Sequence, residues 1–531
     1  MPRFTYDFPY PSQRMPVFAR NMVATSQPLA AQAGLQMLQA GGNAMDAALA
    51  TAIALVVVEP TGNGLGSDAF AIFSEGNEVH GVNASGKSPR ALSHDHFAGR
   101  TEVPLHGWDP VMVPGAVSLW RDMSVQHGAL PFAKLFEPAI RYATEGFHVS
   151  PLTAFGWQRA AKVFSRFESF MATFAPDGHG PNPGDVVRLP DHAATLQSIA
   201  ETNGASFYEG DIAEKIVAYA KETGGFLTTD DLGEHENISC GTMSQAYGSV
   251  ELHQIPPNGQ GLAALIALGI LRHHPVADYQ VDGADSLHVQ IEAMKLGLAD
   301  AHRYIADPDH LEFPVERLLD EEYLGQRATE IDMKIAKNPG HGVPKLGGTV
   351  YLATGDSQGR MVSFIQSNYH GFGSGIVVPG TGIALQNRGA GFSLDPTHPN
   401  CVAGAKRAFH TIIPGFLTRG GTPLSAFGVM GGPVQAQGQL QVVVRLVDYE
   451  QNPQTILDAP RWHIIQGREV AIERGIAPNV LGELSRRGHL LNLDNTLIGG
   501  RPFGGAQMVY NLGDGFVGAT DPRKDGLAAG Y

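Results

Sequence analysis

The pattern of apolar and polar residues divides the chain into a mostly helical first part and a strand-rich second part. A first helix is predicted after Thr25, with Ser26 as its N-cap and Pro28 in its first turn. A second helix begins near Asn43 and continues through DAALATAIALVVV, which is apolar on nearly every side. A helix that is apolar all round is normally buried, so we expect this one in the core.

Further along, AFAIFSEGNEVHGVNASG reads as short strands, and the periodicity from about residue 115 to 345 is mostly helical. The segment 325–346 is polar and ends in KNPGHGVPK, which indicates an exposed loop. From Gly347 onward, strands are predicted in TVYLAT, GRMVSFIQS, TGIALQN, HTIIPGFLTRG and LSAFGVMGG, followed by two helices and further short strands. Two strand sheets with helices outside them satisfy the layering of a large α/β (α+β) unit. No repeat or long linker divides the chain, so we expect one compact unit.

Composition and charge exclude several classes of protein. The net charge is −15, and no cluster of Lys and Arg is long enough to bind phosphates, so we expect no nucleic acid partner. The longest apolar stretch, Ala47 to Val58, is too short to span a bilayer, which argues against a membrane partner. The first 22 residues lack the apolar region of a secretory signal, and we expect a cytoplasmic protein. The two cysteines, Cys240 and Cys401, imply no disulfide framework, and Cys401 is expected to be inert.

Other common types of site are absent from the sequence. The run ALVVVEPTGNGLGSD lacks the full spacing of a dinucleotide-binding loop, and no G-x-S-x-G elbow offers a serine nucleophile. The histidine groups His94-Asp95-His96 and His273-His274 lack the helical spacing or accompanying Cys of a zinc site. We therefore expect no metal and no cofactor.

The stretch LGGTVYLATGD places Thr349 after two glycines, at the start of a predicted strand. A β-branched residue that opens a strand is common, but here an exposed loop enters the strand through Gly-Gly, which can adopt backbone geometries closed to other residues. Such geometry would let the Thr349 hydroxyl attack the carbonyl carbon of Gly348 and shift the acyl group from nitrogen to oxygen. Hydrolysis of that ester would free an α-amine, with a pKa near ~8, that can act as base for its own hydroxyl.

These residues lie within a longer resemblance. The chain resembles the γ-glutamyltranspeptidase family of N-terminal nucleophile hydrolases over nearly its full length. The stretches that carry the resemblance are MVATSQPLAAQAGLQMLQAGGNAMDAALATAIALVVVEP, DPVMVPGAV, PPNGQG, GGTVYLAT, HGFGSGIVVPGTGIALQNRGAGF, FHTIIPGF and GVMGGPVQAQG, in the family's order. The resemblance implies a four-layer αββα sandwich. It also implies self-cleavage into a large piece, residues 1–348, and a small piece, residues 349–531, which stay associated as one compact unit.

Matched to the family, Thr349 is the expected nucleophile and Ser367 the second hydroxyl that assists it, where the family usually has Thr. Tyr369 falls where the transpeptidases commonly have Asn, near the substrate amine. Gly431 and Gly432 match the pair whose backbone N–H groups form the oxyanion hole, a role that suits glycine because its backbone can approach the oxyanion closely.

The departures from the family concern the substrate. The arginine that binds the glutamyl α-carboxylate is replaced by Ser85, and the acidic residue that pairs with the α-amine by Gly391. A neighbouring amide residue becomes Arg388, and the paired serines match Lys406-Arg407. Such a pocket should prefer an anionic acyl group without a free α-amine. Alternatively, Arg388 braces its loop by bonding backbone carbonyls, and Lys406 and Arg407 are ordinary solvated charges.

The sequence thus predicts a self-processing amidohydrolase that cleaves a γ-glutamyl or related anionic acyl amide and transfers the acyl group mainly to water. One alternative is an oxamate or glutaryl-type (cephalosporin) amide hydrolase without γ-glutamyl specificity. Another is an unprocessed, non-catalytic relative that binds small molecules or partners. The expected partners are a small-molecule anionic amide substrate and the two cleaved fragments with each other, with a homo-oligomer of such heterodimers left open.

Overall fold

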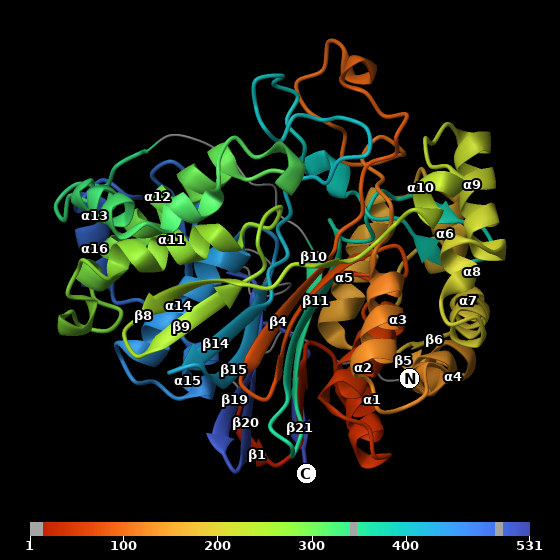
Figure 1. The fold of residues 1–531 in the computed structure, drawn as a ribbon, viewed down its shortest axis with the longest axis horizontal. Helices are drawn as coiled ribbons and strands as arrows, with labels where there is room; N and C mark the ends of the chain where they lie inside the picture. Colours follow the sequence, from red (N-terminus) through yellow and green to blue (C-terminus); the bar gives the residue numbers. More distant parts are fainter. Residues whose placement is uncertain (1–13, 340–347, 494–502) are drawn as a thin grey trace.

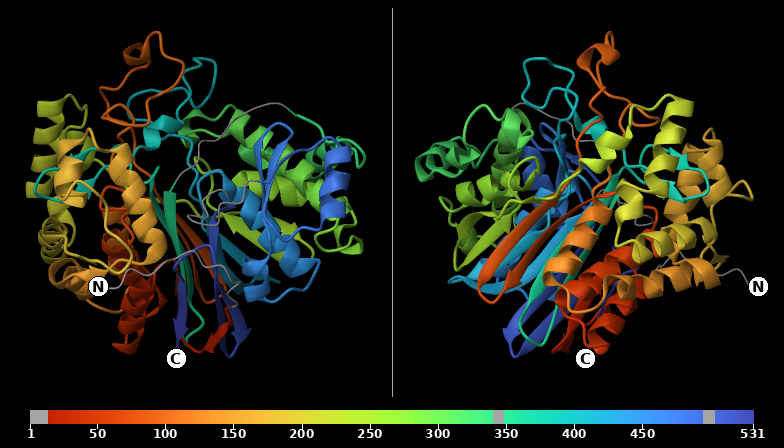
Figure 2. Two further views of the ribbon diagram at one scale, coloured as in Figure 1. Left: turned by 180° about the vertical axis from the view of Figure 1, so that it is seen from behind. Right: turned by 45° about the vertical axis from the view of Figure 1, so that its right-hand side comes forward.

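Two antiparallel sheets face each other at the centre of the molecule, and helices cover the outer face of each (Figure 1). The computed structural model describes residues 14–339, 348–493 and 503–531. Within these ranges the layers run helix, sheet, sheet, helix, which confirms the predicted αββα sandwich. The views from behind and from an oblique angle show the same arrangement (Figure 2).

Each sheet has seven strands, and each combines strands from distant parts of the chain. The first sheet has the order β1 (Val17–Ala19), β20 (Gly515–Thr520), β19 (Gly505–Gly513), β15 (Thr422–Met430), β14 (Gly415–Arg419), β9 (Val250–Gln254) and β8 (Met243–Tyr247). The second has the order β21 (Leu527–Gly530), β2 (Met22–Thr25), β10 (Gly348–Gly355), β11 (Met361–Tyr369), β3 (Asp68–Glu75), β4 (Glu78–Ala84) and β7 (Ile238–Ser239).

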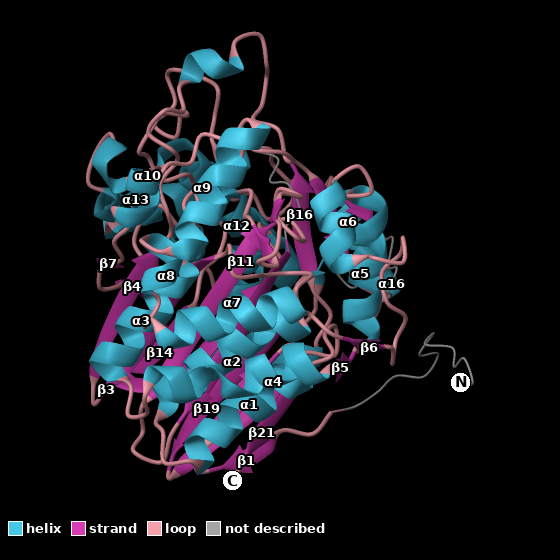
Figure 3. Cartoon of the chain, turned by 90° about the vertical axis from the view of Figure 1, so that its right-hand side faces the viewer, coloured by secondary structure: helices cyan, strands magenta, loops and turns pink. Residues whose placement is uncertain are grey.

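Helices from the first part of the chain lie on the outer face of the second sheet, as Figure 3 shows for α1, α2, α4 and α7. They are α1 (Pro28–Gln39), α2 (Ala44–Val58), α3 (Ala116–His127), α4 (Glu137–Glu145), α5 (Pro151–Val163), α6 (Glu168–Phe174), α7 (Pro190–Glu201), α8 (Ala205–Tyr208), α9 (Asp211–Thr223) and α10 (Thr229–Gly233). The first sheet is covered by α11 (Gly261–Leu271), α12 (Ala284–Tyr304), α13 (Glu321–Thr329), α14 (Val434–Val447), α15 (Pro453–Asp458) and α16 (Pro478–Arg486).

The remaining strands form small sheets outside these layers. They are β5 (Phe147–His148) with β6 (Val186–Val187), β12 (Val377–Val378) with β13 (Ile383–Ala384), and β16 (Trp462–Gln466), β17 (Glu469–Ile472) and β18 (Leu490–Asn492). The strand predicted in TGIALQN is therefore only the two-residue β13. The polar segment 325–346 begins inside α13, and its residues 340–346 lie outside the described ones.

Strand β10 shows how one strand serves two cores. Val350 and Leu352 point to the helices over the second sheet, whereas Tyr351 and Ala353 point into the core between the sheets. This alternation is the period of two that a β-strand imposes. Because both faces of the strand are covered, its side chains from Val350 to Ala353 are apolar on both sides, as expected for a strand in the interior of the sandwich.

The two predicted N-terminal helices are present, with one change at their caps. All residues of α2 are buried, as predicted, and Asn43 caps it in a reciprocal pair with Asp46. The N-cap of α1 is Gln27, not Ser26, because the Gln27 side chain accepts hydrogen bonds from the first free N–H groups. Ser26 instead donates to Glu59 Oε2 at 2.5 Å. Among the described helices, none is both long and apolar enough to cross a bilayer.

Candidate functional site

Three strands of the second sheet place candidate residues at one end of the sandwich. β10 begins at Gly348, β11 ends at Tyr369 and β3 begins at Asp68, and these neighbouring strands are antiparallel. The start of one strand and the end of the next therefore meet at the same edge. Between Gly348 and Val350 the register with β11 shifts, so the ladder is irregular at Thr349. Such irregularities often re-aim a side chain next to an active site.

Thr349 is buried, with 3% of its surface exposed, and its Oγ1 lies 3.2 Å from Ser367 Oγ. Ser367 Oγ also accepts a hydrogen bond from the backbone N–H of Tyr369 at 2.8 Å, which fixes the serine hydroxyl toward Thr349. Gly62 lies against the backbone of Thr349: a Cβ added there would come within 3.2 Å of the threonine carbonyl. The structure thus brings together the two hydroxyls that the sequence singled out.

Gly431 and Gly432 follow β15 directly and lead into α14. Their φ angles are 134° and 65°, a region that favours glycine, so the turn requires both residues. Gln260 Nε2 donates to the carbonyl oxygen of Gly432 at 2.9 Å and to that of Thr411 at 2.6 Å. This buried carboxamide holds the glycine turn in place at the start of α14.

Gln435, in the first turn of α14, contacts Thr349 although sequence reasoning did not select it. Its Nε2 lies 3.4 Å from Thr349 Oγ1, and its Oε1 accepts from the backbone N–H of Ile413 at 3.0 Å. The residue is fully buried. Its position two residues after Gly-Gly-Pro was the available signal, because a residue just inside a helix that starts at the glycine turn must lie near that turn.

Arg388 and Tyr369 form a stacked pair near these hydroxyls. Tyr369 has a φ of 77°, a strained value for a non-glycine residue, and its ring lies 4.2 Å from the guanidinium carbon of Arg388. Arg388 is 1% exposed and donates through Nη1 to Thr411 Oγ1 at 2.9 Å. Its Nε and Nη2 have no hydrogen-bond partner among the described residues. Burial lowers the pKa of Arg388 to about 10, so it remains a cation at neutral pH.

Asp68 is the carboxylate beside this cation, and it was missed in the sequence. Burial raises its pKa to about 7, while Arg388 opposes that rise. Its oxygens accept from Gly86 N at 3.1 Å and from His410 Nε2 at 3.0 Å. Burial also holds the pKa of His410 well below its usual value, so the histidine is neutral. Asp68 therefore already has partners and is near its titration point at neutral pH.

The other predicted substrate residues lie in a different setting. Lys406 Nζ donates to the carbonyl oxygens of Pro399 and Cys401, at 2.6 and 2.8 Å. Arg407 Nε donates to the carbonyl oxygen of Ser85 at 2.9 Å. Both residues are buried, so they are not the solvated charges of the alternative interpretation. These contacts favour loop bracing, and the side chain that meets Arg388 is Thr411, four positions after Arg407.

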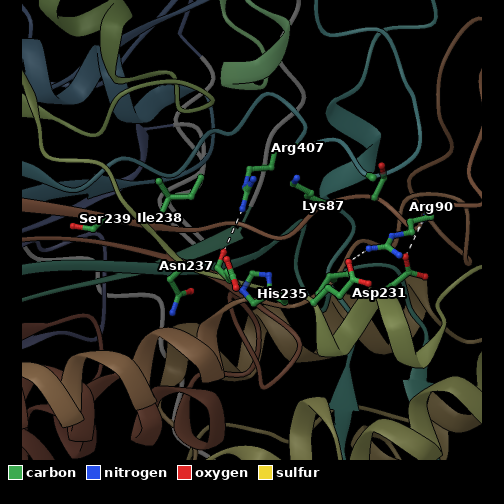
Figure 4. Close-up of a pocket in the computed structure, with 13 residues that line it drawn as sticks. Lys87, Arg90, Asp231, His235, Asn237, Ile238, Ser239 and Arg407 are labelled. Atoms are coloured by element: carbon green, nitrogen blue, oxygen red, sulfur yellow. Dashed lines mark hydrogen bonds and ion pairs between the residues drawn. The ribbon is translucent and has the colours of Figure 1, made fainter.

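A cavity of about 430 Å³ lies beyond Arg407 and is lined also by Lys87, Arg90, Asp231 and His235 (Figure 4). Thr349 does not line this cavity. Arg90 pairs with Glu234, and burial lowers the pKa of His235 to about 3, which leaves that ring neutral. The two predicted hydroxyls and the buried Gln435 carboxamide meet at Thr349, and none of these residues lines the cavity.

Among the described residues, one buried group has metal-ligand character: His288, Glu292 and His489, with ligand atoms within 4.8 Å of one another. His288 Nδ1 and His489 Nε2 are hydrogen-bonded to each other at 2.8 Å. Glu292 Oε1 accepts from the Lys295 ammonium at 2.7 Å. Because the ligand atoms already bond to each other and to a cation, the group fits a structural network better than a metal centre.

The four layers of helix, sheet, sheet and helix are the fold of an N-terminal nucleophile type of hydrolase. The chain belongs to the gamma-glutamyltranspeptidase family, whose family model matches residues 30–531. The family and the fold expected from the sequence motifs are thereby confirmed, and the chain is an enzyme of this family.

Individual relatives cover almost the whole chain. It is 35% identical over 523 residues to a glutathione hydrolase-like proenzyme of Bacillus subtilis, which covers 96% of this chain and 98% of the relative. It is 34% identical over 533 residues to an oxamate amidohydrolase proenzyme of Klebsiella pneumoniae, and this match covers 97% of this chain and 99% of the relative. The solved structure of cephalosporin acylase from Bacillus halodurans superimposes with a TM-score of 0.95 at 46% identity, covering 100% of this chain and 99% of that one.

Proposed function

We propose that the chain is a self-processing threonine amidohydrolase that is cut between Gly348 and Thr349. The observation that carries the proposal is the buried Thr349 hydroxyl, 3.2 Å from Ser367 Oγ at the opening of a central strand. Relatives whose names contain the word proenzyme support the processing step. The cut leaves pieces of 348 and 183 residues. They stay together because β10 lies between β2 and β11, so one sheet contains strands from both pieces.

In the proposed self-cleavage, the attacking atom is the hydroxyl oxygen of Thr349. Thr349 Oγ1 attacks the carbonyl carbon of Gly348 and gives up its proton, and the C–N bond then breaks so that the nitrogen takes a proton. The acyl group now sits on Oγ1 as an ester, and water hydrolyses the ester to leave a carboxylate on Gly348. The products are a free hydroxyl and a free α-amine on the same residue.

In turnover the α-amine of Thr349 accepts the proton of Oγ1 while Oγ1 attacks the substrate carbonyl. The amide C–N bond breaks, and the leaving amine takes that proton. Water then attacks the acyl-enzyme and releases the acid. Ser367 orients the nucleophile, and the backbone N–H groups of Gly431 and Gly432 stabilise the oxyanion in both steps.

We propose that the acyl group of the substrate carries a negative charge and has no free α-amine. Arg388 supports this choice, because it is a buried cation with two N–H groups unpartnered among the described residues. A buried unpaired charge is unfavourable, and a substrate carboxylate would relieve it. Asp68, the nearby carboxylate, is occupied by Gly86 and His410 and offers no free partner for a substrate ammonium. Oxamate and glutaryl amides fit this description better than glutathione does.

Two measurements test the proposal. On a denaturing gel, the native protein should give two bands, and N-terminal sequencing of the smaller should read Thr-Val-Tyr-Leu. Thr349→Ala should stay a single chain without activity. One full-length band in both fresh and aged native protein would instead support the non-catalytic relative, and cleavage in Thr349→Ala would exclude intramolecular attack by this hydroxyl.

The substrate class is tested by product release from glutathione, oxamate and a glutaryl amide, assayed side by side. We expect the two amides without an α-amine to be turned over faster. If glutathione were turned over best by a wide margin, the pocket argument would be wrong. The cytoplasmic location stays a prediction, which fractionation of the producing cells would test.

A further inference from the structure

Gln435 contacts both Thr349, the proposed nucleophile, and the backbone of Ile413. The residue is fully buried at the start of α14, with Nε2 3.4 Å from Thr349 Oγ1 and Oε1 3.0 Å from the backbone nitrogen of Ile413. A backbone N–H can only donate, so the Ile413 contact requires the carboxamide oxygen on that side. The amide group must then face Thr349. The orientation of this carboxamide is therefore fixed by its surroundings.

We propose that Gln435 is a catalytic residue whose carboxamide N–H donates to Thr349 Oγ1 and stabilises negative charge on that oxygen. This inference rests on the proposed role of Thr349 as nucleophile. Charge develops on Oγ1 when its proton passes to the α-amine, and again when Oγ1 leaves the acyl carbon during hydrolysis. A fixed donor in a buried site stabilises such charge more than water would.

The length of the contact agrees with this role. At 3.4 Å it is longer than a good N–H···O hydrogen bond, as is common for catalytic contacts before the substrate is bound. A neutral hydroxyl is a modest acceptor, whereas an oxygen that becomes anionic attracts the donor and shortens the bond. The contribution is therefore larger in the transition state than in the resting enzyme, which is the requirement for catalysis.

The same helix supplies a matched control. Gln439 lies one turn further along α14, is also fully buried, and donates through Nε2 to the carbonyl oxygen of Ile413 at 2.9 Å. Both glutamines thus brace the same residue, but only Gln435 contacts Thr349. Gln439→Met removes the brace to Ile413 and the acceptor for Gln254 Nε2, 2.6 Å away, without touching Thr349. Gln435→Met removes a brace to Ile413 together with the donor to Thr349.

The test compares the two variants by the rate of self-cleavage of freshly made precursor, which requires no known substrate. It also compares kcat and KM for whichever of oxamate, a glutaryl amide and glutathione the native enzyme turns over fastest. We expect Gln435→Met to lower the cleavage rate and kcat about 10²-fold, with KM nearly unchanged. Gln439→Met should stay within a few-fold of the native enzyme in both.

Gln435→Glu separates donation from bracing. A carboxylate keeps the acceptor for Ile413 N–H but removes the donor, and its charge raises the pKa of the neighbouring α-amine. Because the amine acts as the neutral base, the rise of kcat with pH should move to higher pH. A residue that only braces the loop would leave kcat at its pH plateau unchanged, because the glutamate keeps the acceptor for Ile413 N–H.

The inference is overturned if Gln435→Met stays within about twofold of Gln439→Met in both rates, or if Gln435→Glu retains the native kcat at its pH plateau. Thermal unfolding of each variant shows whether it is folded, and Gln435→Glu supplies the answer if Gln435→Met does not fold. Failure of the proposed function looks different: the native protein itself would then show no new terminus at Thr349.

Discussion

We expect replacement of Arg388 by an apolar residue to raise the stability of the protein and to lower its activity on an anionic substrate. Its guanidinium is buried against the ring of Tyr369, makes one hydrogen bond to Thr411 and has two N–H groups without described partners. Arg388→Met keeps most of the side-chain volume and removes the charge. The variant therefore separates a cation that is kept for a ligand from one that braces its own loop.

The effect on stability can be estimated from the contacts. Burial lowers the pKa of Arg388 from 12.5 to about 10, and each pKa unit corresponds to about 1.4 kcal/mol, so holding the charge here costs about 3 kcal/mol. The hydrogen bond to Thr411 and the stacking on Tyr369 offset roughly 1 kcal/mol each. We therefore expect Arg388→Met to raise the free energy of unfolding by about 1 kcal/mol, in line with replacements of buried charges by apolar residues.

Activity should change in the opposite direction. Two charge-assisted hydrogen bonds to a substrate carboxylate are worth about 1.5–3 kcal/mol each, so kcat/KM for oxamate should fall by about 10²-fold or more. Oxamide has nearly the same shape without the charge, and its kcat/KM should hardly change. The assay is ammonia release from the two compounds, with denaturant unfolding of the same preparations.

Arg461 is the control for a buried arginine with a structural role. It is 3% exposed, and its Nη2 donates to Asp521 Oδ2 at 2.6 Å. Arg461→Met should destabilise the protein by about 1.5–3 kcal/mol, because it removes a charge-assisted hydrogen bond to the buried Asp521 carboxylate, which keeps Arg523 as its second cation. If Arg388→Met behaved like Arg461→Met and left the oxamate-to-oxamide ratio unchanged, Arg388 would be a brace and the substrate argument would be refuted.

Two further predictions concern stability. Asp68 has a raised pKa of about 7 in the folded chain, against 3.8 in the unfolded one, so its contribution to stability is present below pH 4 and is lost as the pH rises to 7. The asparagine of Asp68→Asn does not titrate, so the native protein should lose stability relative to this variant as the pH rises from 4 to 7. Denaturant unfolding at pH 4, 5.5 and 7 measures the difference between the two free energies of unfolding. A difference that stays constant with pH would contradict the raised pKa. Asn43→Ala removes the side-chain cap of α2 and should lower the unfolding free energy by about 1 kcal/mol. Calorimetry checks this value, and an unchanged unfolding midpoint would show that the cap contributes nothing.

The fold and the pair of hydroxyls could be predicted because their signals are local. The apolar run of α2, the alternation in β10 and β11, and the Gly-Gly pairs all lie in continuous sequence. Thr349 and Ser367 are 18 residues apart, and two antiparallel strands joined by a short turn bring them opposite each other. The cap of α1 was misassigned because Ser26 and Gln27 are adjacent polar residues, and the choice depends on Glu59, 33 residues away.

The surroundings of Thr349 and Arg388 could not be predicted in the same way, because their contacts join residues that are distant in the chain. Gln435 meets Thr349 across 86 residues, and Asp68 meets His410 across 342. The sequence likewise gave no sign that Thr411 is the side chain that accepts from Arg388, 23 residues away. The sequence alone does not distinguish a charged residue that donates to backbone carbonyl oxygens from one that faces a ligand.

The charges near Thr349 impose opposite requirements on pH. In the proposed mechanism the α-amine of Thr349 must be neutral to act as a base, which favours activity above its pKa near ~8. Asp68, however, ionises as the pH rises through about 7, and its negative charge then opposes binding of an anion beside Arg388. Turnover of an anionic substrate should therefore be fastest in a narrow pH range, between the pH at which Asp68 begins to ionise and the pH at which the amine is fully neutral. An uncharged amide experiences only the second requirement, because neither Asp68 nor Arg388 contributes to its binding. In the proposed mechanism both substrates use the same nucleophile and the same base, so the difference between the two pH profiles reports on Asp68 and Arg388 alone.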